Sequence, residues 1–147
     1  MDIRIRKSEN ADIPLIYRMI LEFAIFQQTP EKVKVTIDQM HQDADIFRCL
    51  VAENENGDLV GYACFYYAYY SWTGKVLYLD DLYVKEEYRG RGLGQSFFDA
   101  LIKEAKSGSC KKMRWQVSRW NEKAIQFYKH IGATIDDVEM NCDLTFK

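Results

Sequence analysis

The chain has 147 residues, of which 48% are apolar and 14% aromatic, and its formal net charge is −2 at pH 7. This composition excludes a disordered chain, and the small net charge gives no reason to expect nucleic acid or an anionic membrane as a partner. Since no stretch has the length and apolarity of a membrane span or a signal peptide, we expect a single cytoplasmic domain over residues 1–147.

The cysteines and histidines give no indication of a metal site. The four cysteines include no Cys-x-x-Cys pair, and both histidines lie far from any cysteine pair. Three of the cysteines lie in apolar, strand-like runs, where we expect buried and reduced thiols.

The N-terminal part of the chain predicts one strand and two helices. Isoleucines alternate with arginines over residues 1–7, which is the pattern of a half-buried strand. Apolar residues then recur at helical spacing over 13–24, with Asp12 as the expected N-cap. A second helix begins after Thr36 and has a thin apolar face, so we expect it to be peripheral and near a substrate.

The middle of the chain predicts an antiparallel meander of three strands, over 48–53, 59–69 and 76–84, because turn residues separate three apolar and aromatic runs. In the third run the apolar residues change phase, from odd positions at Leu77 and Leu79 to even positions further on. Either a β-bulge at Asp80-Asp81 or a strand buried on both faces would explain this change, and the pattern alone leaves both open.

A short basic loop joins the third strand to a helix over 93–106. It reads Arg89-Gly90-Arg91-Gly92-Leu93-Gly94. The first N–H groups of a helix lack internal acceptors, and glycines let a phosphate approach them closely. The spacing fits neither a dinucleotide loop nor a nucleoside triphosphate loop. A phosphate site and a solvated basic turn remain as interpretations of the motif alone.

The C-terminal part predicts a strand over 111–118, parallel to the 76–84 strand because a helix connects the two. Asn121 is expected to cap a helix that runs to Ile131, with Gly132 as its C-terminal stop. Residues 133–147 are expected to form one or two final strands.

Two motifs in this order resemble the GNAT superfamily of N-acetyltransferases. The pattern Arg89-x-x-Gly92-x-Gly94 between a strand and a helix resembles its pyrophosphate loop for acetyl-coenzyme A, and residues 120–133 resemble its later motif. The resemblance implies an α/β (α+β) GNAT acyl-CoA N-acyltransferase fold. That fold has a mixed central sheet of six to seven strands, flanked by about four helices.

Residues 70–84, followed by Glu87-Tyr88-Arg89-Gly90, are similar to the spermidine/spermine (diamine) acetyltransferases and their thialysine-acetylating relatives. This similarity implies transfer of an acetyl group from acetyl-CoA to a primary amine of a small cationic substrate, in a ternary complex, by a homodimer. Two acidic positions that help to bind polyamine in that family are Gln27 and Tyr70 here. A polyamine, a diamine and a lysine-like amino acid therefore stay open as acceptors.

The resemblance also assigns roles to residues. Tyr128 is expected to be the general acid, and Asp80 and Asp81 are expected to attract the ammonium group and relay its proton. The other expected substrate-side residues are Trp72, Glu22, Gln27 and Tyr70. Acetyl-CoA is expected to contact Leu82, Tyr83, Val84, Arg89, Gly90, Arg91, Gly92, Leu93, Gly94, Gln95, Ser96, Asn121 and Tyr128.

These expectations favour the bulge at Asp80-Asp81, because it would separate the two parallel strands and leave room for the coenzyme arm. Two alternative functions remain open: acetylation of a protein N-terminus or lysine, and a non-catalytic module that binds coenzyme A. The aromatic run from Tyr66 to Tyr70 is a candidate dimer surface.

Overall fold

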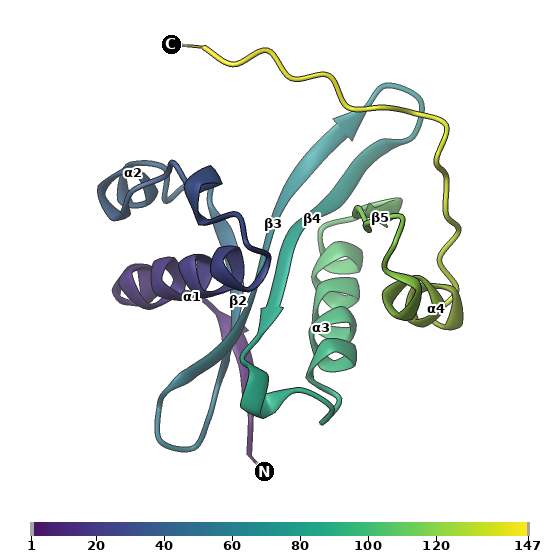
Figure 1. Cartoon of the computed structure of the whole chain (residues 1–147). Helices are drawn as coiled ribbons and strands as arrows, with labels where there is room; N and C mark the ends of the chain where they lie inside the picture. Colours follow the sequence, from purple (N-terminus) through teal and green to yellow (C-terminus); the bar gives the residue numbers. More distant parts are fainter. Residues whose placement is uncertain (1, 147) are drawn as a thin grey trace. The chain divides into compact units, whose positions relative to one another are not determined.

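The computed structural model describes residues 2–146 and divides into two compact units, Met1–Trp115 and Gln116–Lys147, each of which is described by itself (Figure 1). The elements of the first unit are β1 (Arg4–Lys7), α1 (Ile13–Phe26), α2 (Ile37–Gln42), β2 (Arg48–Glu53), β3 (Leu59–Tyr70), β4 (Gly74–Val84), α3 (Leu93–Ser107) and β5 (Lys112–Arg114). The second unit contains α4 (Glu122–His130). The single domain expected from the sequence stays a prediction.

The strands form one sheet in the order β1-β2-β3-β4-β5. The first four strands are antiparallel to their neighbours, and β5 pairs with β4 in parallel, so the predicted meander and the predicted parallel strand are both confirmed. The strand count is lower than expected. The described residues contain five strands instead of six to seven.

The missing strands belong to residues 133–146, which contain no strand although their apolar residues alternate. Val138, Met140, Leu144 and Phe146 are all strongly exposed. A strand needs a neighbour to satisfy its backbone N–H and C=O groups, and the described part of the second unit offers no other strand. The expectation of one or two final strands is therefore wrong for this segment, and the strand expected over 111–118 is only three residues long.

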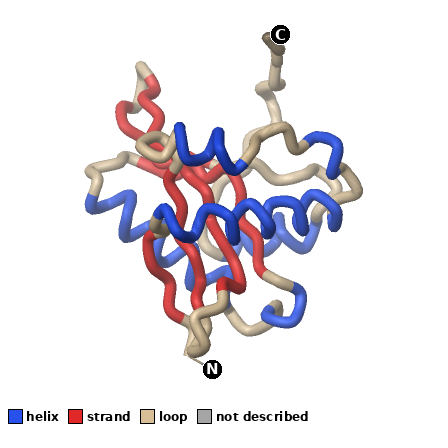
Figure 2. The backbone as a smooth tube through the Cα atoms, turned by 90° about the vertical axis from the view of Figure 1, so that its left-hand side faces the viewer, coloured by secondary structure: helices blue, strands red, loops and turns tan. Residues whose placement is uncertain are grey.

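Helices cover both faces of the sheet. Figure 1 shows α1 and α2 on one side and α3 on the other, and α1 crosses in front of the strands in Figure 2. The core under α1 combines residues from five elements, namely Ile16, Met40, Val51, Tyr62 and Tyr83. Met40 is only 3% exposed, so α2 contributes to the core and is less peripheral than its thin apolar face predicts.

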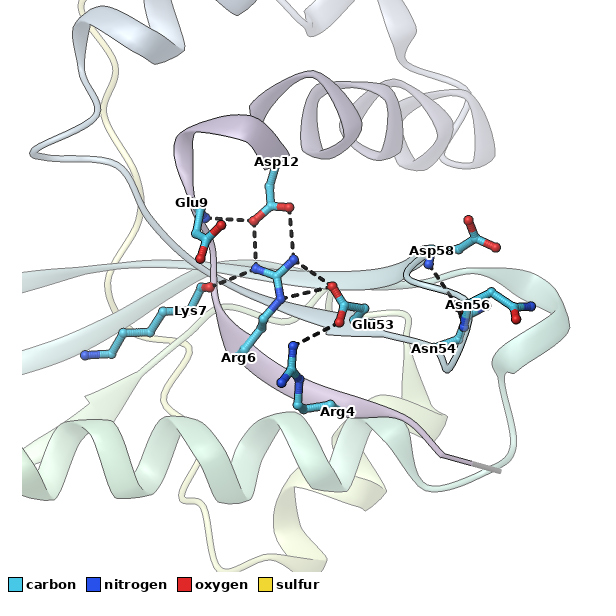
Figure 3. A network of polar contacts seen from close by, with 9 residues as sticks. All are labelled: Arg4, Arg6, Lys7, Glu9, Asp12, Glu53, Asn54, Asn56 and Asp58. Carbon is cyan, nitrogen blue, oxygen red and sulfur yellow. Dashed lines mark hydrogen bonds and ion pairs between the residues drawn. The ribbon is translucent and has the colours of Figure 1, made fainter.

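An ion cluster holds the start of α1 against the sheet (Figure 3). The Arg6 guanidinium donates to both Asp12 oxygens at 2.8 and 3.1 Å and to Glu53 Oε2 at 2.9 Å. Asp12 also accepts the Glu9 N–H at 2.7 Å, and it makes no side-chain bond to the first turn of α1. Asp12 therefore occupies the expected N-cap position of α1, but it does not make the expected side-chain cap bond. The carboxylate instead joins β1 to the turn before α1, and the hydrogen bonds from Arg6 hold the pKa of Asp12 below its ordinary value.

The predicted β-bulge is confirmed. Cys64 of β3 pairs with Asp81, and the next residue, Phe65, pairs with Leu79, so Asp80 is the extra residue of β4. Asp81 shares the face of Cys64, which belongs to the core under α1. Leu79 lies on the opposite face with Phe65, and strand alternation returns Asp80 to the face of Asp81. The bulge thus places both carboxylates on the α1 face of the sheet.

Candidate active site

The acidic pair is held by a buried tyrosine. Tyr62 is 0% exposed, and its hydroxyl donates to Asp81 Oδ2 at 2.6 Å. Desolvation, the largest cause, and the charge of Asp80 together raise the pKa of Asp81 to about 6, although the hydrogen bonds from Tyr62 and the Leu82 N–H lower it in part. Partial desolvation also raises the pKa of Asp80. Asp81 is therefore ionised at neutral pH, with a pKa close enough to neutrality for it to accept a proton.

Sequence reasoning did not identify Tyr62 as a functional residue. The available signal was a tyrosine two residues before Cys64, on the same buried face of β3. A hydroxyl that is fully removed from water needs a hydrogen-bond partner. Asp81 is that partner because the register of β3 and β4 brings the two side chains together.

The edge of β4 beyond Tyr78 has no paired strand on its β5 side. The parallel ladder joins Val76, Leu77 and Tyr78 to residues 112–114 and then ends. In the described part of the chain, residues 79–84 therefore keep backbone groups on this edge that β5 does not use. This unpaired edge lies next to the bulge, and the backbone of Leu82, Tyr83 and Val84 on it is predicted to meet the coenzyme arm.

The glycine loop forms an open anion cradle. Gly90 and Gly92 have φ values of 74° and 81°, in the left-handed region that disfavours other residues. Gly92 is the N-cap of α3 and offers no side-chain cap, so the first N–H groups of this 15-residue helix lack internal acceptors. A Cβ at Gly90, Gly92 or Gly94 would meet nothing within 4 Å. The space over the loop and the positive end of the helix suit a pyrophosphate.

The side chains of the loop bind within the protein. The Arg89 Nε donates to the Val84 carbonyl at 2.8 Å, and the guanidinium lies 4.7 Å from the centre of the Phe26 ring. The Arg91 guanidinium lies 5.5 Å from the ring of Tyr88. Within α3, the Gln95 amide donates to Asp99 and the Ser96 hydroxyl donates to the Gly92 carbonyl. Backbone N–H groups are therefore what residues 93–96 present to a ligand.

The other expected substrate-side residues are not gathered in one place as the acidic pair is. Glu22 Oε1 lies 3.8 Å from Lys85 Nζ, which offsets the negative charge that Glu22 was expected to add. Gln27 is the C-cap of α1. Trp72 is 97% exposed in the turn between β3 and β4, and Asp80 lies six residues beyond the start of β4, or roughly 20 Å along the strand. The structure does not bring Trp72 to the acids.

In the second unit, the local geometry of α4 follows the prediction. The Asn121 side chain accepts the Ala124 N–H at 3.2 Å as an N-cap, and Gly132 has φ 96° just after the helix. The role of Asn121 visible here is thus that of a helix cap. Burial raises the pKa of Tyr128, so its hydroxyl stays protonated at neutral pH, as a general acid requires.

Two thiols lie next to the acidic pair. Cys49 and Cys64 face each other across β2 and β3, both buried and free as expected, with their sulfur atoms 3.8 Å apart. The contact with Cys49, together with burial, raises the pKa of Cys64, which makes it a protonated core residue. Cys142 is exposed instead, because its segment forms no strand.

Among residues 2–146, no group of three or more His, Cys, Asp or Glu side chains is arranged to hold a metal ion. None of the helices in this range is long and apolar enough to cross a membrane.

A family model and several known proteins match this chain. The sequence model of the acetyltransferase (GNAT) family matches residues 13–133, a range that includes the acidic pair, the glycine loop and Tyr128. The crystal structure of an aminoglycoside acetyltransferase from an uncultured soil metagenomic sample has a TM-score of 0.82, over 99% of this chain and 100% of that chain. At 17% identity this likeness shows the fold alone.

Acetyltransferases from several organisms, a mouse and a human protein among them, are similar in sequence. A thialysine N-epsilon-acetyltransferase of Mus musculus is 36% identical over 141 residues, covering 88% of this chain and 83% of the mouse protein. The spermidine/spermine N(1)-acetyltransferase-like protein 1 of Homo sapiens is 36% identical over 140 residues, covering 88% of this chain and 20% of the human protein. The resemblance and the α/β fold expected from the sequence are confirmed, and the chain belongs to the acetyltransferase (GNAT) family.

Proposed function

We propose that the protein transfers the acetyl group of acetyl-CoA to a primary amine of a small cationic substrate by direct attack in a ternary complex. One observation carries this proposal. The bulge in β4 places Asp80 and Asp81 together on one face, within the stretch of β4 that β5 leaves unpaired and upstream of the glycine loop. The likeness to a thialysine and a spermidine/spermine acetyltransferase supports an amine as the acceptor.

The bound acetyl-CoA supplies an activated thioester. The N–H groups at the start of α3 hold its pyrophosphate, and the free edge of β4 at Leu82–Val84 orients the rest of the coenzyme. An N–H group of this edge also stabilises the oxyanion that develops at the thioester.

The acidic pair prepares the amine. Asp80 and Asp81 attract the ammonium group, and Asp81 accepts its proton, directly or through water, so that a neutral amine attacks the thioester carbon. The hydrogen bond from Tyr62 fixes Asp81 in place during this transfer. As the carbon–sulfur bond breaks, Tyr128 donates its proton to the leaving thiolate. The attacked nitrogen releases its second proton, which restores the Tyr128 hydroxyl through solvent.

We also propose that the protein works in the cytoplasm as a homodimer. Within the aromatic run, Tyr69 is 80% exposed and lies on the opposite face of β3 from Tyr66 and Tyr70, so it is the best candidate for a dimer contact. Gel filtration with light scattering would measure the mass directly.

An amine panel tests the proposed reaction. Polyamines, lysine, thialysine and aminoglycosides are incubated with acetyl-CoA and the protein, and free coenzyme A is measured. We expect release with at least one small amine, and a large loss of amine use in Asp81→Asn with unchanged coenzyme binding. Release only with a protein or peptide acceptor would favour the protein-acetylating alternative, and no release with any acceptor would favour the non-catalytic module.

A further inference from the structure

The C-terminal half of α1 contacts the segment between β4 and α3 at two points. We call this segment, residues 85–92, the connector. Glu22 Oε1 lies 3.8 Å from Lys85 Nζ, and the Arg89 guanidinium lies 4.7 Å from the centre of the Phe26 ring. Residues four apart share one face of a helix. One face of α1 therefore follows the connector from the end of β4 to the residue before Gly90.

The Arg89 side chain holds the connector against the end of β4. Its Nε donates to the carbonyl of Val84, the last residue of β4, at 2.8 Å. Its guanidinium lies near two rings from different elements, Phe26 of α1 at 4.7 Å and Tyr83 of β4 at 5.6 Å. The Arg89 N–H donates to the Glu86 carbonyl at 3.1 Å. Both the backbone and the side chain of Arg89 thus fix the point at which the glycine loop begins.

The glycine loop needs such a fixed point. Gly90 and Gly92 follow Arg89 directly and have φ values in the left-handed region. Glycines have more backbone freedom than other residues, so a loop that contains two of them loses more entropy when it is ordered. A ligand binds more tightly to N–H groups that are already in place, because less of this entropy is lost on binding. The anchor at Arg89 therefore affects how well the first N–H groups of α3 hold a pyrophosphate.

Phe26 is the part of this arrangement that burial does not explain. Its side chain is 63% exposed, so it gains little from leaving water, whereas Tyr83 is only 8% exposed and stacks on Phe23 of α1 at 5.2 Å. A planar guanidinium can lie against an aromatic face while its Nε donates a hydrogen bond, and a lysine ammonium cannot reproduce both contacts. The exposed ring of Phe26 thus suits the role of a platform for Arg89.

We propose that Arg89 and Phe26 are positioning residues for the coenzyme. Arg89 is a clasp that holds the glycine loop in the shape of the anion cradle, and Phe26 orients this clasp from α1. The inference rests on the proposed function. It replaces the expected direct contact between the Arg89 side chain and acetyl-CoA with an effect that is transmitted through the loop.

The binding of acetyl-CoA, measured by calorimetry, separates the two roles of Arg89. A charge that contacts the pyrophosphate directly would be largely retained in Arg89→Lys, but a clasp needs the guanidinium. We therefore expect Arg89→Lys and Arg89→Ala to raise the Kd alike, by about tenfold or more. At saturating acetyl-CoA, kcat should change less than about twofold, because the proposed acid and base are untouched.

Variants of Phe26 test the platform. Phe26→Leu should raise the Kd by about two- to fivefold, and Phe26→Trp should restore it because the aromatic face is kept. When Phe26→Leu is added to Arg89→Ala, the Kd should not rise further, since the ring acts through the arginine. Ile25→Ala is the control. Ile25 is the neighbouring residue of α1 and is 62% exposed, so this variant should bind acetyl-CoA like the wild type.

Two results would overturn the proposal: wild-type affinity in Arg89→Lys together with a large loss in Arg89→Ala, or additive losses from Phe26→Leu and Arg89→Ala. If the wild type binds no acetyl-CoA, the proposed function fails. Hydrogen exchange of the free protein then decides whether Arg89 orders the loop. The Ser96 N–H donates to the Gly92 carbonyl at 3.0 Å. Faster exchange of this N–H in Phe26→Leu and Arg89→Ala, but not in Ile25→Ala, would support the clasp, and unchanged exchange would overturn it.

Discussion

The Tyr62 hydroxyl donates a 2.6 Å hydrogen bond to Asp81 Oδ2 from a side chain that is completely buried. The two residues lie on neighbouring strands at the bulge, where Asp81 is placed opposite Cys64. The other groups near Asp81 are Asp80, which raises the pKa of Asp81, and the protonated thiol of Cys64. Tyr17 of α1, which is also titratable, packs against the core under α1 that contains Tyr62 and Cys64. Tyr62 is thus a positioning residue for the proposed base.

Replacing Tyr62 by phenylalanine should raise the pKa of Asp81. The hydrogen bond from Tyr62 stabilises the ionised carboxylate and lowers its pKa. Without this bond, desolvation raises the pKa of Asp81 further. Because hydrogen bonds to charged groups contribute about 1.5–3 kcal/mol, the shift should be about one pH unit or more. The acid limb of kcat/KM for the amine, measured from pH 5 to 9, should move to higher pH by this amount.

Tyr67→Phe is a matched control for this measurement. Tyr67 lies on the same strand but on the opposite face, and its hydroxyl donates to Glu104 of α3 at 2.7 Å. The Tyr67→Phe variant should be less stable than the wild type, but its acid limb should stay at the same pH. If both variants left the limb in place, Tyr62 would have a structural role only.

Asp81→Asn should make the protein more stable at alkaline pH while it removes the proposed base. The folded-state pKa of Asp81, about 6, is above its ordinary value of 3.8. The stability contribution of Asp81 is therefore fully present below about pH 4 and is lost as the pH rises through 6. The amide avoids the cost of a desolvated charge, so the free energy of unfolding at pH 8 should rise by about 1–2 kcal/mol, after allowance for partial exposure.

Urea unfolding of Asp81→Asn and wild type at pH 4.5 and pH 8 measures this difference. The gap between the two proteins should be small at the lower pH and larger at the higher pH. Asp45→Asn, which changes an exposed carboxylate before β2, serves as the control. A constant gap at both pH values would show that ionisation of Asp81 does not oppose folding.

Gly94→Ala should separate folding from coenzyme binding. Gly94 lies in the first turn of α3 with open space where a Cβ would project, and alanine is favoured over glycine in a helix by about 0.5–1 kcal/mol. The free protein should therefore be equally or more stable. A methyl group over the anion cradle should weaken acetyl-CoA binding at least tenfold, as measured by calorimetry. Unchanged affinity would place the pyrophosphate elsewhere.

Gly92→Ala gives the opposite pattern for comparison. Its φ of 81° lies in the left-handed region, which costs alanine about 1 kcal/mol or more. This variant should lose stability even without the coenzyme. The two glycines thus distinguish a backbone requirement from a ligand requirement within one loop.

Tyr128→Phe should lower kcat with little change in the Kd of acetyl-CoA. Tyr128 is half-buried, and partial desolvation raises the pKa of its hydroxyl, which therefore stays protonated and can donate to a thiolate. General acid catalysis contributes about 100-fold or more, and we expect a loss on that scale. Single-turnover kinetics with the best amine of the panel would measure the chemical step. An unchanged rate would remove Tyr128 from the role of acid.

The features that depend on neighbouring residues in the chain were predictable from the sequence. Thr36 and Asn121 cap their helices as expected, because a cap needs only a short polar side chain and a free N–H group two or three residues later. The glycine loop and the bulge also follow from local patterns. The change of apolar phase at Asp80-Asp81 required an extra residue, and the register of β3 and β4 contains it.

The partners that depend on long-range packing were not predictable in this way. Asp12 is a good N-cap by residue type, but Arg6 on the neighbouring strand binds its carboxylate instead. On α3, Phe98 is buried while Ile102, about one helical turn further on and equally apolar, is more than one-third exposed. Residues 133–146 alternate like a strand but form none, since alternation describes the faces of a strand and says nothing about its neighbour.

The sequence by itself determined the order of the main elements, the glycine loop, the acidic pair and the family to which they point. Only the tertiary structure decided that Tyr62 binds Asp81, that both acids share the α1 face, and that Arg89 binds Val84 and lies over Phe26 of α1. The physical reason is register and packing. A shift of one residue between β3 and β4 would send the acids to the opposite side of the sheet, and Phe26 meets Arg89 only because α1 packs against β4.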